Sequence, residues 1–412
     1  MLEYIVLTAA IIILSLVGFN KFTKKCQKPV TLVFLAACFL MLLAVSALRL
    51  NTGWDYTMYT RGFFQMAHSG FDTLEYRGWE YGFNILTKII AFFTKDQRVY
   101  IAVVSVICLA GPFYVILRYS KKPWLSVLLY INLYFFYCSM NFLRQSIAIS
   151  VIMFAYTFLL DRKLLRYVIF VALAACFHVT ALVMLPVYFL VKPKASFKIP
   201  LLYCILFIWI YISSNATLDL IAEYFRTDYS ESVFFARGLS FVHIIIPSVI
   251  LTAGMTILFS GDAANSYILQ QPDKRGNGKT YGDVINFHNN LMYFSYLWII
   301  VMLRHSILER FSYYTYTLAI LYIPELINFA DMKFNYFYKN RLNKTEKTED
   351  LSDAEKEKLG AAHKKRRDIM RFSLVFAVVA ITVLYNIYGL AAYERGVHGV
   401  YPYQSWFSFN FT

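Results

Sequence analysis

The chain has 412 residues, of which 59% are hydrophobic and only 16% are charged, and its mean hydropathy is +0.51. This composition excludes an ordinary soluble globular protein and indicates an integral membrane protein. The formal net charge is +15, and its meaning depends on where the basic residues fall between the apolar segments.

Apolar runs that can cross about 30 Å of hydrocarbon recur along the chain and predict helices rather than strands. The first run has Glu3 in place of a basic leader and no small-residue cleavage site after it, so we expect it to be a retained span. Together with two shorter elements, about twelve membrane helices are expected. The predicted spans are 2–19, 30–48, 99–117, 123–139, 145–160, 200–214, 240–258, 287–303, 312–328 and 372–392.

The two shorter elements lie where the loops would otherwise end on the wrong side of the membrane. Residues 82–93 are expected in the outer interface, or as a segment that dips into the bilayer and returns. Residues 167–191 are expected to form a hairpin or a pair of short helices with His178 near the outer turn. The alternative is one long tilted helix, which would place the lysine-rich segment 192–198 outside.

Lysine and arginine concentrate in segments that the positive-inside rule assigns to the cytoplasm, which puts both termini outside. These segments are 21–29, 118–123, 161–166, 192–198 and 331–371. The net charge of +15 then lies on the cytoplasmic side and reflects topology, which argues against nucleic-acid binding. The basic residues left outside are two lysines, Lys88 and Lys95, and ten arginines: Arg49, Arg61, Arg77, Arg98, Arg144, Arg226, Arg237, Arg304, Arg310 and Arg395.

The preference for arginine outside predicts a face that binds anions. Arginine holds phosphate and carboxylate with a rigid, bidentate fork, whereas lysine is a flexible point charge. The alternative is a set of structural arginine–carboxylate pairs, which we expect to account for about half of these arginines.

Polar and aromatic residues gather at the predicted outer ends of the spans, in residues 48–64, 76–83, 140–148 and 303–316, and the terminal YPYQSWF adds further aromatics. Ionisable groups at membrane depth usually face a cavity, so this convergence predicts a site. For any single tyrosine or tryptophan, an interfacial anchor is the simpler interpretation. No DxD, HExxH or GxSxG motif supports a metal-dependent sugar transferase, a zinc protease or a serine hydrolase.

Five short motifs, in this order, resemble the EpsG/Wzy-like family of bacterial polysaccharide polymerases. They are GWDYTMY after an arginine, EYGF, NFLRQSIAIS, ACFHVTALVMLPVYFL, and RFSYY followed by LAILYIPEL. The resemblance runs from about residue 45 to the end of the 312–328 span, and the terminal YPYQ is a weaker match. The charged segment 331–371 is not required by the family.

The resemblance implies an all-α polytopic membrane glycosyltransferase with a GT-C-like architecture. We expect a helical bundle over residues 1–330 with an outward-facing site and an outer loop at 49–98, a cytoplasmic charged linker at 331–371, and a last helix with an outer tail at 372–412. The enzyme would elongate capsular or exopolysaccharide outside the bacterial plasma membrane. The donor would be a growing glycan on undecaprenyl diphosphate, and the acceptor the terminal sugar hydroxyl of another lipid-linked repeat unit.

The expected chemistry needs neither a metal nor a nucleotide, and no cofactor is expected. A lipid diphosphate is a leaving group that needs stabilisation of its charge rather than a general acid. Arg144 and Arg310 match the family's arginines and are the leading diphosphate ligands, with Arg49 and Arg304 as weaker candidates. Besides the lipid-linked oligosaccharide and the bilayer, a flippase and a chain-length regulator are candidate partners.

The acceptor hydroxyl also needs a general base, for which His178, Asp55 and Glu80 are the candidates. A role in helix packing is the alternative for His178, and a salt bridge to Arg49 or Arg77 is the alternative for the two acids. Contacts that orient the sugar are expected from Trp54, Tyr56, Asn141, Gln145 and Tyr313.

Three other functions compete with a polymerase. An O-antigen-type ligase would use the same donor with a different acceptor. A lipid-oligosaccharide flippase needs charged groups along a central path, but residues 99–117, 145–160 and 372–392 are almost uncharged at mid-span. A structural scaffold is disfavoured by the arginine asymmetry.

Overall fold

The computed structural model describes residues 2–18, 28–70, 76, 78–191, 198–213, 216, 242–273, 278–301, 303, 308–348, 352–392 and 397–407. Within these ranges the regular elements are helices, accompanied by two isolated β-bridges. Four of the helices are long and apolar enough to cross a membrane, or up to six if each of two bent pairs is one span. The chain is therefore an all-α polytopic membrane protein, and the count of about twelve membrane helices stays a prediction.

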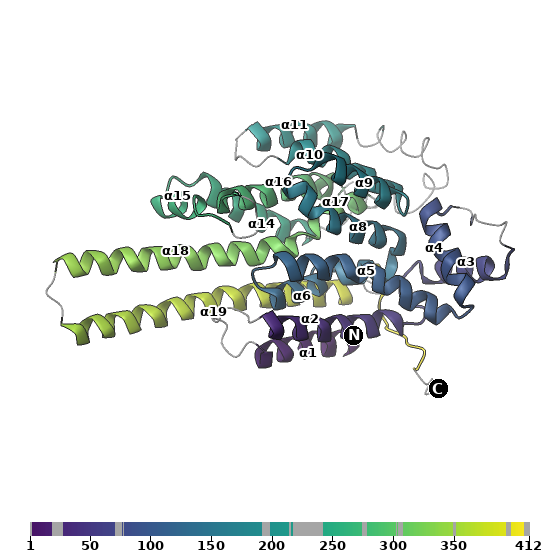
Figure 1. Ribbon diagram of the computed structural model, residues 1–412, viewed down its shortest axis with the longest axis horizontal. Coiled ribbons are helices and arrows are strands. Elements are labelled where there is room, and N and C mark those ends of the chain that lie inside the picture. The colour runs from purple at the N-terminus through teal and green to yellow at the C-terminus, as the bar shows by residue number, and fades with distance from the viewer. Residues whose placement is uncertain are drawn as a thin grey trace. The chain divides into compact units, whose positions relative to one another are not determined.

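The chain divides into two compact units. The first comprises Met1–Leu159, Lys163–Leu182 and Asp368–Thr412. It contains α1 (Leu2–Gly18), α2 (Lys28–Ala47), α3 (Tyr56–His68), α4 (Tyr81–Phe93), α5 (Gln97–Tyr119), α6 (Pro123–Asn132), α7 (Phe135–Asn141), nearly all of α8 (Leu143–Leu160), α9 (Leu164–Ala175), the end of α19 (Asp353–Ala391) and the turn Val397–Gly399 (Figure 1).

The second unit comprises Leu160–Arg162 and Val183–Arg367. It contains α10 (Met184–Leu190), α11 (Lys198–Ile212), α14 (Val242–Phe259), α15 (Ala263–Leu269), α16 (Tyr281–Val301), α17 (Glu309–Tyr316), α18 (Ala319–Thr348) and the start of α19. Within this unit α18 and the start of α19 run antiparallel (Figure 1). The Arg367 guanidinium of α19 donates to Asn335 Oδ1 of α18 at 3.2 Å. The charged segment after residue 331 is thus helical up to Thr348 and again from Asp353.

Hydropathy places most spans within a few residues of the observed helices, but the predicted span 312–328 is wrong as one element. Its first part is α17, which ends at Tyr316, and its second part is the start of a helix that continues to Thr348. The predicted span 123–139 is broken into α6 and α7 with a bend of 55°, at Tyr134 with its left-handed φ of 69°. Segment 167–191 is interrupted at Cys176–His178, which confirms a pair of short helices.

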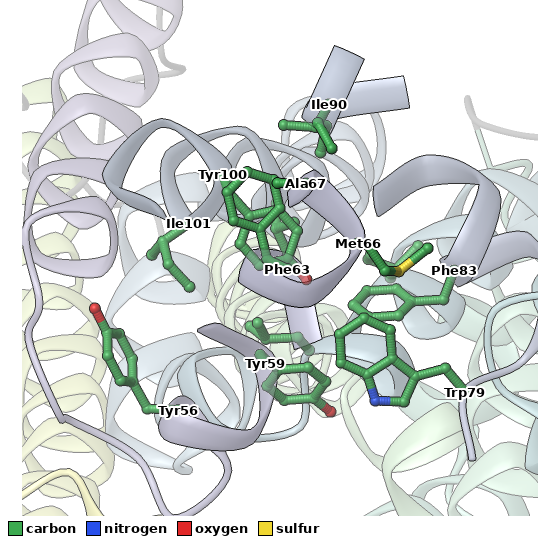
Figure 2. Close-up of a cluster of buried hydrophobic side chains, with 14 of the residues drawn as sticks. Tyr56, Tyr59, Phe63, Met66, Ala67, Trp79, Phe83, Ile90, Tyr100 and Ile101 are labelled. Carbon is green, nitrogen blue, oxygen red and sulfur yellow. The ribbon is translucent and has the colours of Figure 1, made fainter. Parts of the chain in front are cut away.

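An aromatic cluster anchors α3 and α4 to α5, although the sequence predicts no helix for α3 (Figure 2). Phe63 stacks on Tyr100 with ring centroids 4.4 Å apart, and Trp79 meets Phe83 edge to face at 4.9 Å. These rings are among the most buried side chains of the unit. The segment between α2 and α5 is therefore a packed element that can hold polar residues in fixed positions.

A serine of α8 bonds to the backbone of α5. The Ser150 hydroxyl accepts from Gly111 N–H at 2.8 Å and donates to Ile107 O at 2.7 Å, just before Pro112. A Cβ on Gly111 would lie 2.4 Å from Ser150 O. Glycine at this position therefore permits the close approach of the two helices.

We expect Gly111→Ala to destabilise the first unit by about 1–3 kcal/mol, because the added methyl group has no space. The melting temperature of the purified protein in detergent measures the effect. Gly261→Ala is the matched control, since a Cβ there meets nothing within 4 Å. Equal melting temperatures for Gly111→Ala and Gly261→Ala would contradict the close crossing.

Candidate functional site

Several predicted outer segments meet at one end of the first unit. Gly53 N–H donates to Gly399 O at 2.9 Å, and Asp55 N–H donates to Asn141 Oδ1 at 3.0 Å. Gly53 has a φ of 102°, and a Cβ there would lie 3.0 Å from Met140 O, so glycine is needed for this approach. Both ends of the chain lie here as well, because the Tyr4 hydroxyl donates to Val400 O at 2.8 Å.

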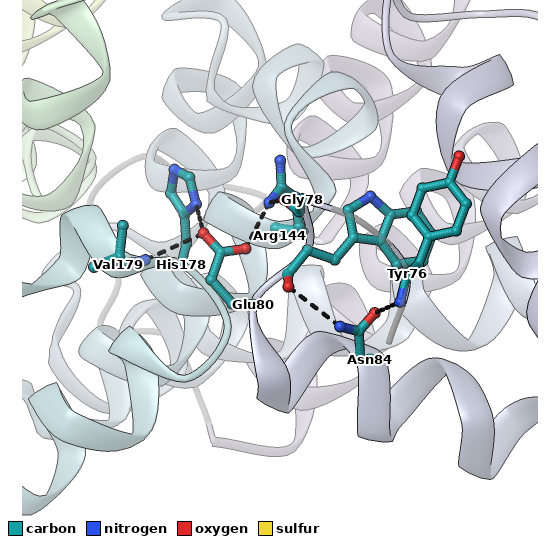
Figure 3. A network of polar contacts seen from close by, with 8 residues as sticks. Tyr76, Gly78, Glu80, Asn84, Arg144, His178 and Val179 are labelled. Atoms are coloured by element: carbon teal, nitrogen blue, oxygen red, sulfur yellow. Dashed lines mark hydrogen bonds and ion pairs between the residues drawn. The ribbon is translucent and has the colours of Figure 1, made fainter. Parts of the chain in front are cut away.

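Glu80, Arg144 and His178 form one polar network (Figure 3). Arg144 Nη1 lies 2.6 Å from Glu80 Oε2, and His178 Nδ1 lies 2.8 Å from Glu80 Oε1. The Val179 N–H also donates to Oε1, at 3.3 Å, and Arg144 Nη1 donates to Gly78 O at 2.9 Å. The exposed fractions of the Glu80, Arg144 and His178 side chains are 18%, 13% and 12%. The structure thus brings three residues from three separate motifs into a partly buried cluster.

The EYGF motif explains how Glu80 reaches His178. Glu80 is the N-cap of α4, and Gly82 in the first turn donates its N–H to Cys176 O at 2.8 Å. A Cβ on Gly82 would lie 2.7 Å from that oxygen, so only glycine lets α4 dock on the end of α9. Asn84 accepts from Tyr76 N–H at 3.3 Å and donates to Trp79 O at 3.2 Å, which fixes the loop before Glu80.

The sequence singles out no role for Asn84, and it includes Gly82 only as a member of the EYGF motif. A signal for Asn84 exists, because it follows Glu80 by four positions and so lies on the same face of the helix. The role of Gly82 depends on a contact with α9, which the local pattern does not reveal.

The environment of Glu80 keeps its carboxylate ionised. Burial by itself raises its pKa, but the hydrogen bond from His178 and the positive charge of Arg144 outweigh burial and lower the pKa from 4.5 to about 2. A carboxylate with this pKa is a weak base. The network therefore favours a role for Glu80 in which it holds Arg144 and His178 in position and compensates their positive charge.

A pH titration of stability tests this assignment. Because the folded pKa lies below the unfolded one, the contribution of Glu80 is complete above about pH 4.5 and is lost as the pH falls toward 2. The shift corresponds to about 3 kcal/mol of unfolding free energy. We expect the melting temperature of the wild type to fall more steeply in this range than that of Glu80→Gln. Parallel curves for the two proteins would contradict the assignment.

Arg49 is fully buried, unlike a ligand on an open rim. Its Nη1 donates to Ser46 O, to Ser46 Oγ at 2.9 Å and to Ser105 Oγ at 3.2 Å. The ring of the buried Tyr56 lies 5.9 Å from its guanidinium carbon. Within the described part of the chain, the guanidinium is therefore held by a carbonyl, two hydroxyls and a ring, and the contacts shown for it do not include Asp55.

The remaining predicted residues lie in different surroundings. Trp54 is 51% exposed, whereas Gln145 is 3% exposed on α8. Arg310 and Tyr313 lie on α17 in the second unit, and the Tyr313 hydroxyl donates to Glu309 Oε1 at 2.6 Å. Burial raises the pKa of Glu309 to about 7, against the lowering effects of Tyr313 and the charge of Arg310. Arg304 lies outside the described residues.

The two lysines predicted on the outer side both donate to backbone carbonyls at the C-terminal end of α3. The Lys88 ammonium donates to Met66 O at 2.9 Å and to Gly70 O at 2.8 Å, and the Lys95 ammonium donates to Ala67 O. Cations are favoured at the C-terminal carbonyls of a helix. These lysines are thus explained by helix capping. Across the described ranges, no group of three or more His, Cys, Asp or Glu side chains could hold a metal ion.

A family model described as the EpsG family matches residues 32–338. The matched range includes Glu80, Arg144, His178 and α17. No curated protein matches the chain, and no solved structure matches it.

Proposed function

The chain belongs to the EpsG family, and from that premise we propose that it is a polysaccharide polymerase of the glycosyltransferase type. It would transfer a growing glycan from undecaprenyl diphosphate to the terminal sugar hydroxyl of another lipid-linked repeat unit. The reaction would take place on the outer side of the bacterial plasma membrane, in a GT-C-like bundle. The observation that supports this proposal is the Glu80–Arg144–His178 network at the end of the first unit.

His178 is the proposed general base. When Nδ1 donates to the Glu80 carboxylate, Nε2 carries the lone pair that accepts a proton. As the acceptor oxygen bonds to the anomeric carbon, its proton passes to Nε2 and the bond to the lipid diphosphate breaks. The leaving diphosphate keeps the electron pair of that bond. Glu80 is the proposed positioning residue, because it fixes the orientation of the imidazole and its protonated nitrogen.

Arg144 is the proposed ligand of the leaving diphosphate. Its Nη1 is bonded to Glu80 and Gly78, and its Nε is buried without a hydrogen-bond partner among the described residues. The side chain is still 13% exposed, and its fixed positive charge can stabilise a charge that develops in the transition state. With a neutral His178, the network has no net charge before substrate binds.

Most of the remaining predicted residues have roles in the same proposal. Arg310, with Arg304 as a weaker candidate, would contribute to diphosphate binding, and Asp55 is the alternative base. Trp54, Asn141, Gln145 and Tyr313 would orient the sugars. Arg49 is fully buried beside the Tyr56 ring, so neither residue is assigned to the transfer site. No cofactor is required, both termini would be outside, and a flippase and a chain-length regulator would be partners.

The decisive test supplies the purified protein in detergent with its cognate undecaprenyl-diphosphate repeat unit alone. The expected product is a ladder of longer lipid-linked glycans, formed without added metal or nucleotide. Wild type that stays folded yet consumes no lipid-linked unit would contradict a polymerase.

A transporter of lipid-linked glycans is the second candidate, and the interior of the second unit favours it. Four polar side chains of α16 and one of α18 are at most 5% exposed: Asn286, His288, Asn289, Asn290 and Glu325. Such groups in membrane helices often mark a pathway for a polar solute. Vesicles that contain the purified protein separate the two functions, because a transporter moves the lipid-linked unit across the membrane without elongating it.

A further inference from the structure

Arg49 has an unusual environment for a buried arginine. Its exposed fraction is 0%, and it lies two residues after α2. Arg144 pairs with Glu80, and Arg98 pairs with Asp96. Arg49, in contrast, has no carboxylate partner in the described part of the chain, where its Nε and Nη2 also lack hydrogen-bond partners. Burial of an uncompensated charge costs several kcal/mol.

Two other polar groups beside Arg49 also lack hydrogen-bond partners of normal geometry among the described residues. The Tyr56 ring lies 5.9 Å from the guanidinium carbon, and the Trp406 indole lies next to the Tyr56 hydroxyl. Neither that hydroxyl nor Trp406 Nε1 has a hydrogen bond of normal geometry to a described residue. An arginine and an indole can only donate hydrogen bonds, so Arg49 Nε, Arg49 Nη2 and Trp406 Nε1 are three donors without an acceptor of normal geometry among the described residues.

The C-terminal segment closes this region. Leu50 N–H donates to Gln404 O at 2.8 Å, and Trp406 N–H donates to Leu48 O at 3.0 Å. The Tyr403 hydroxyl donates to Val45 O at 2.9 Å. These bonds tie residues 403–406 to the end of α2 on both sides of Arg49, so a bulky solute has no direct access to the guanidinium.

We propose that Arg49 binds a small inorganic anion, of which chloride is the simplest example, in this closed site. The anion would accept hydrogen bonds from Nε and Nη2, with the Tyr56 hydroxyl and the Trp406 indole as further donors. It would neutralise the buried charge and link the C-terminal segment to α2. This proposal is independent of the proposed transfer reaction, since the site is stabilising rather than catalytic.

Thermal melting of the purified full-length protein tests the proposal. The protein is exchanged into sodium gluconate and titrated with sodium chloride or bromide at constant ionic strength. We expect a saturable rise of several degrees in melting temperature for the wild type and for Arg61→Ala, which replaces an exposed arginine of α3. Arg49→Met removes the charge but keeps much of the side-chain volume, and we expect it to show no halide-dependent rise.

A bromide-soaked crystal gives a second readout that does not require a folded variant. Anomalous density next to Arg49 is the expected result. Identical wild-type melting in gluconate and halide, or no bromide density at Arg49, would overturn the proposal. A shift caused by inorganic pyrophosphate or undecaprenyl diphosphate but not by halide would also overturn it, and would assign Arg49 to the substrate headgroup.

Discussion

Replacing His178 with glutamine is expected to lower the initial rate of glycan transfer by about 10²- to 10⁴-fold, the usual contribution of a general base. The glutamine amide can still donate to Glu80, so the fold should be preserved, but it cannot accept a proton at neutral pH. The rate of ladder formation from the lipid-linked repeat unit measures the loss, and the melting temperature measures the fold.

His68→Gln is the matched control, because His68 is exposed at the end of α3 and its ring bonds only to Phe64 O among the contacts described. It should retain the wild-type rate. Glu80→Gln should lower the rate less than His178→Gln and should change its pH profile, because a neutral amide orients the imidazole without balancing its charge. A full rate in His178→Gln would exclude His178 as the base and would favour Asp55.

Replacing Arg144 with methionine is expected to abolish measurable transfer and to destabilise the first unit by about 3–5 kcal/mol, as in other broken buried pairs. Glu80 is only 18% exposed, so without Arg144 its charge loses the nearest compensation. Melting temperature and ladder formation are the two readouts.

A double substitution separates the structural from the catalytic contribution of Arg144. Glu80→Gln/Arg144→Met removes both charges, so we expect it to recover most of the lost stability, as measured in a double-mutant cycle. Transfer should not recover, because the leaving diphosphate still lacks its ligand. Arg98→Ala should match the wild type in both assays. Recovery of transfer in the double variant would assign Arg144 a purely structural role.

Hydropathy predicts α1, α2, α5 and α8 closely because the bilayer requires long apolar stretches, whatever the tertiary contacts. Hydropathy does not predict a helix, or its full length, where the helical sequence is not apolar. It ends the predicted span at residue 328, whereas α18 continues over a polar, helix-favouring sequence to Thr348. It also misses α3, whose mixed composition is stabilised as a helix by packing of Phe63 and its neighbours.

In the candidate site, too, the sequence predicts some features and misses others. Glu80, Arg144 and His178 can be named from their motifs, but their pairing depends on contacts across 64 and 98 positions of sequence. Sequence proximity suggests Arg77 as a partner of Glu80, but Arg77 lies outside the described residues. The structure pairs Glu80 with Arg144, which is distant in sequence. Arg49 looks like a residue of an open rim in sequence and is enclosed in the structure, because residues more than 350 positions later cover it.

The bond between Leu50 and Gln404 sets the order in which this end of the protein can be completed during biosynthesis. Residues 397–407 are synthesised long after the loop that follows α2. Contacts of such long sequence separation form late. The loop before Trp54 and Asp55 therefore lacks these partners until the later segment has been made and has folded back onto it.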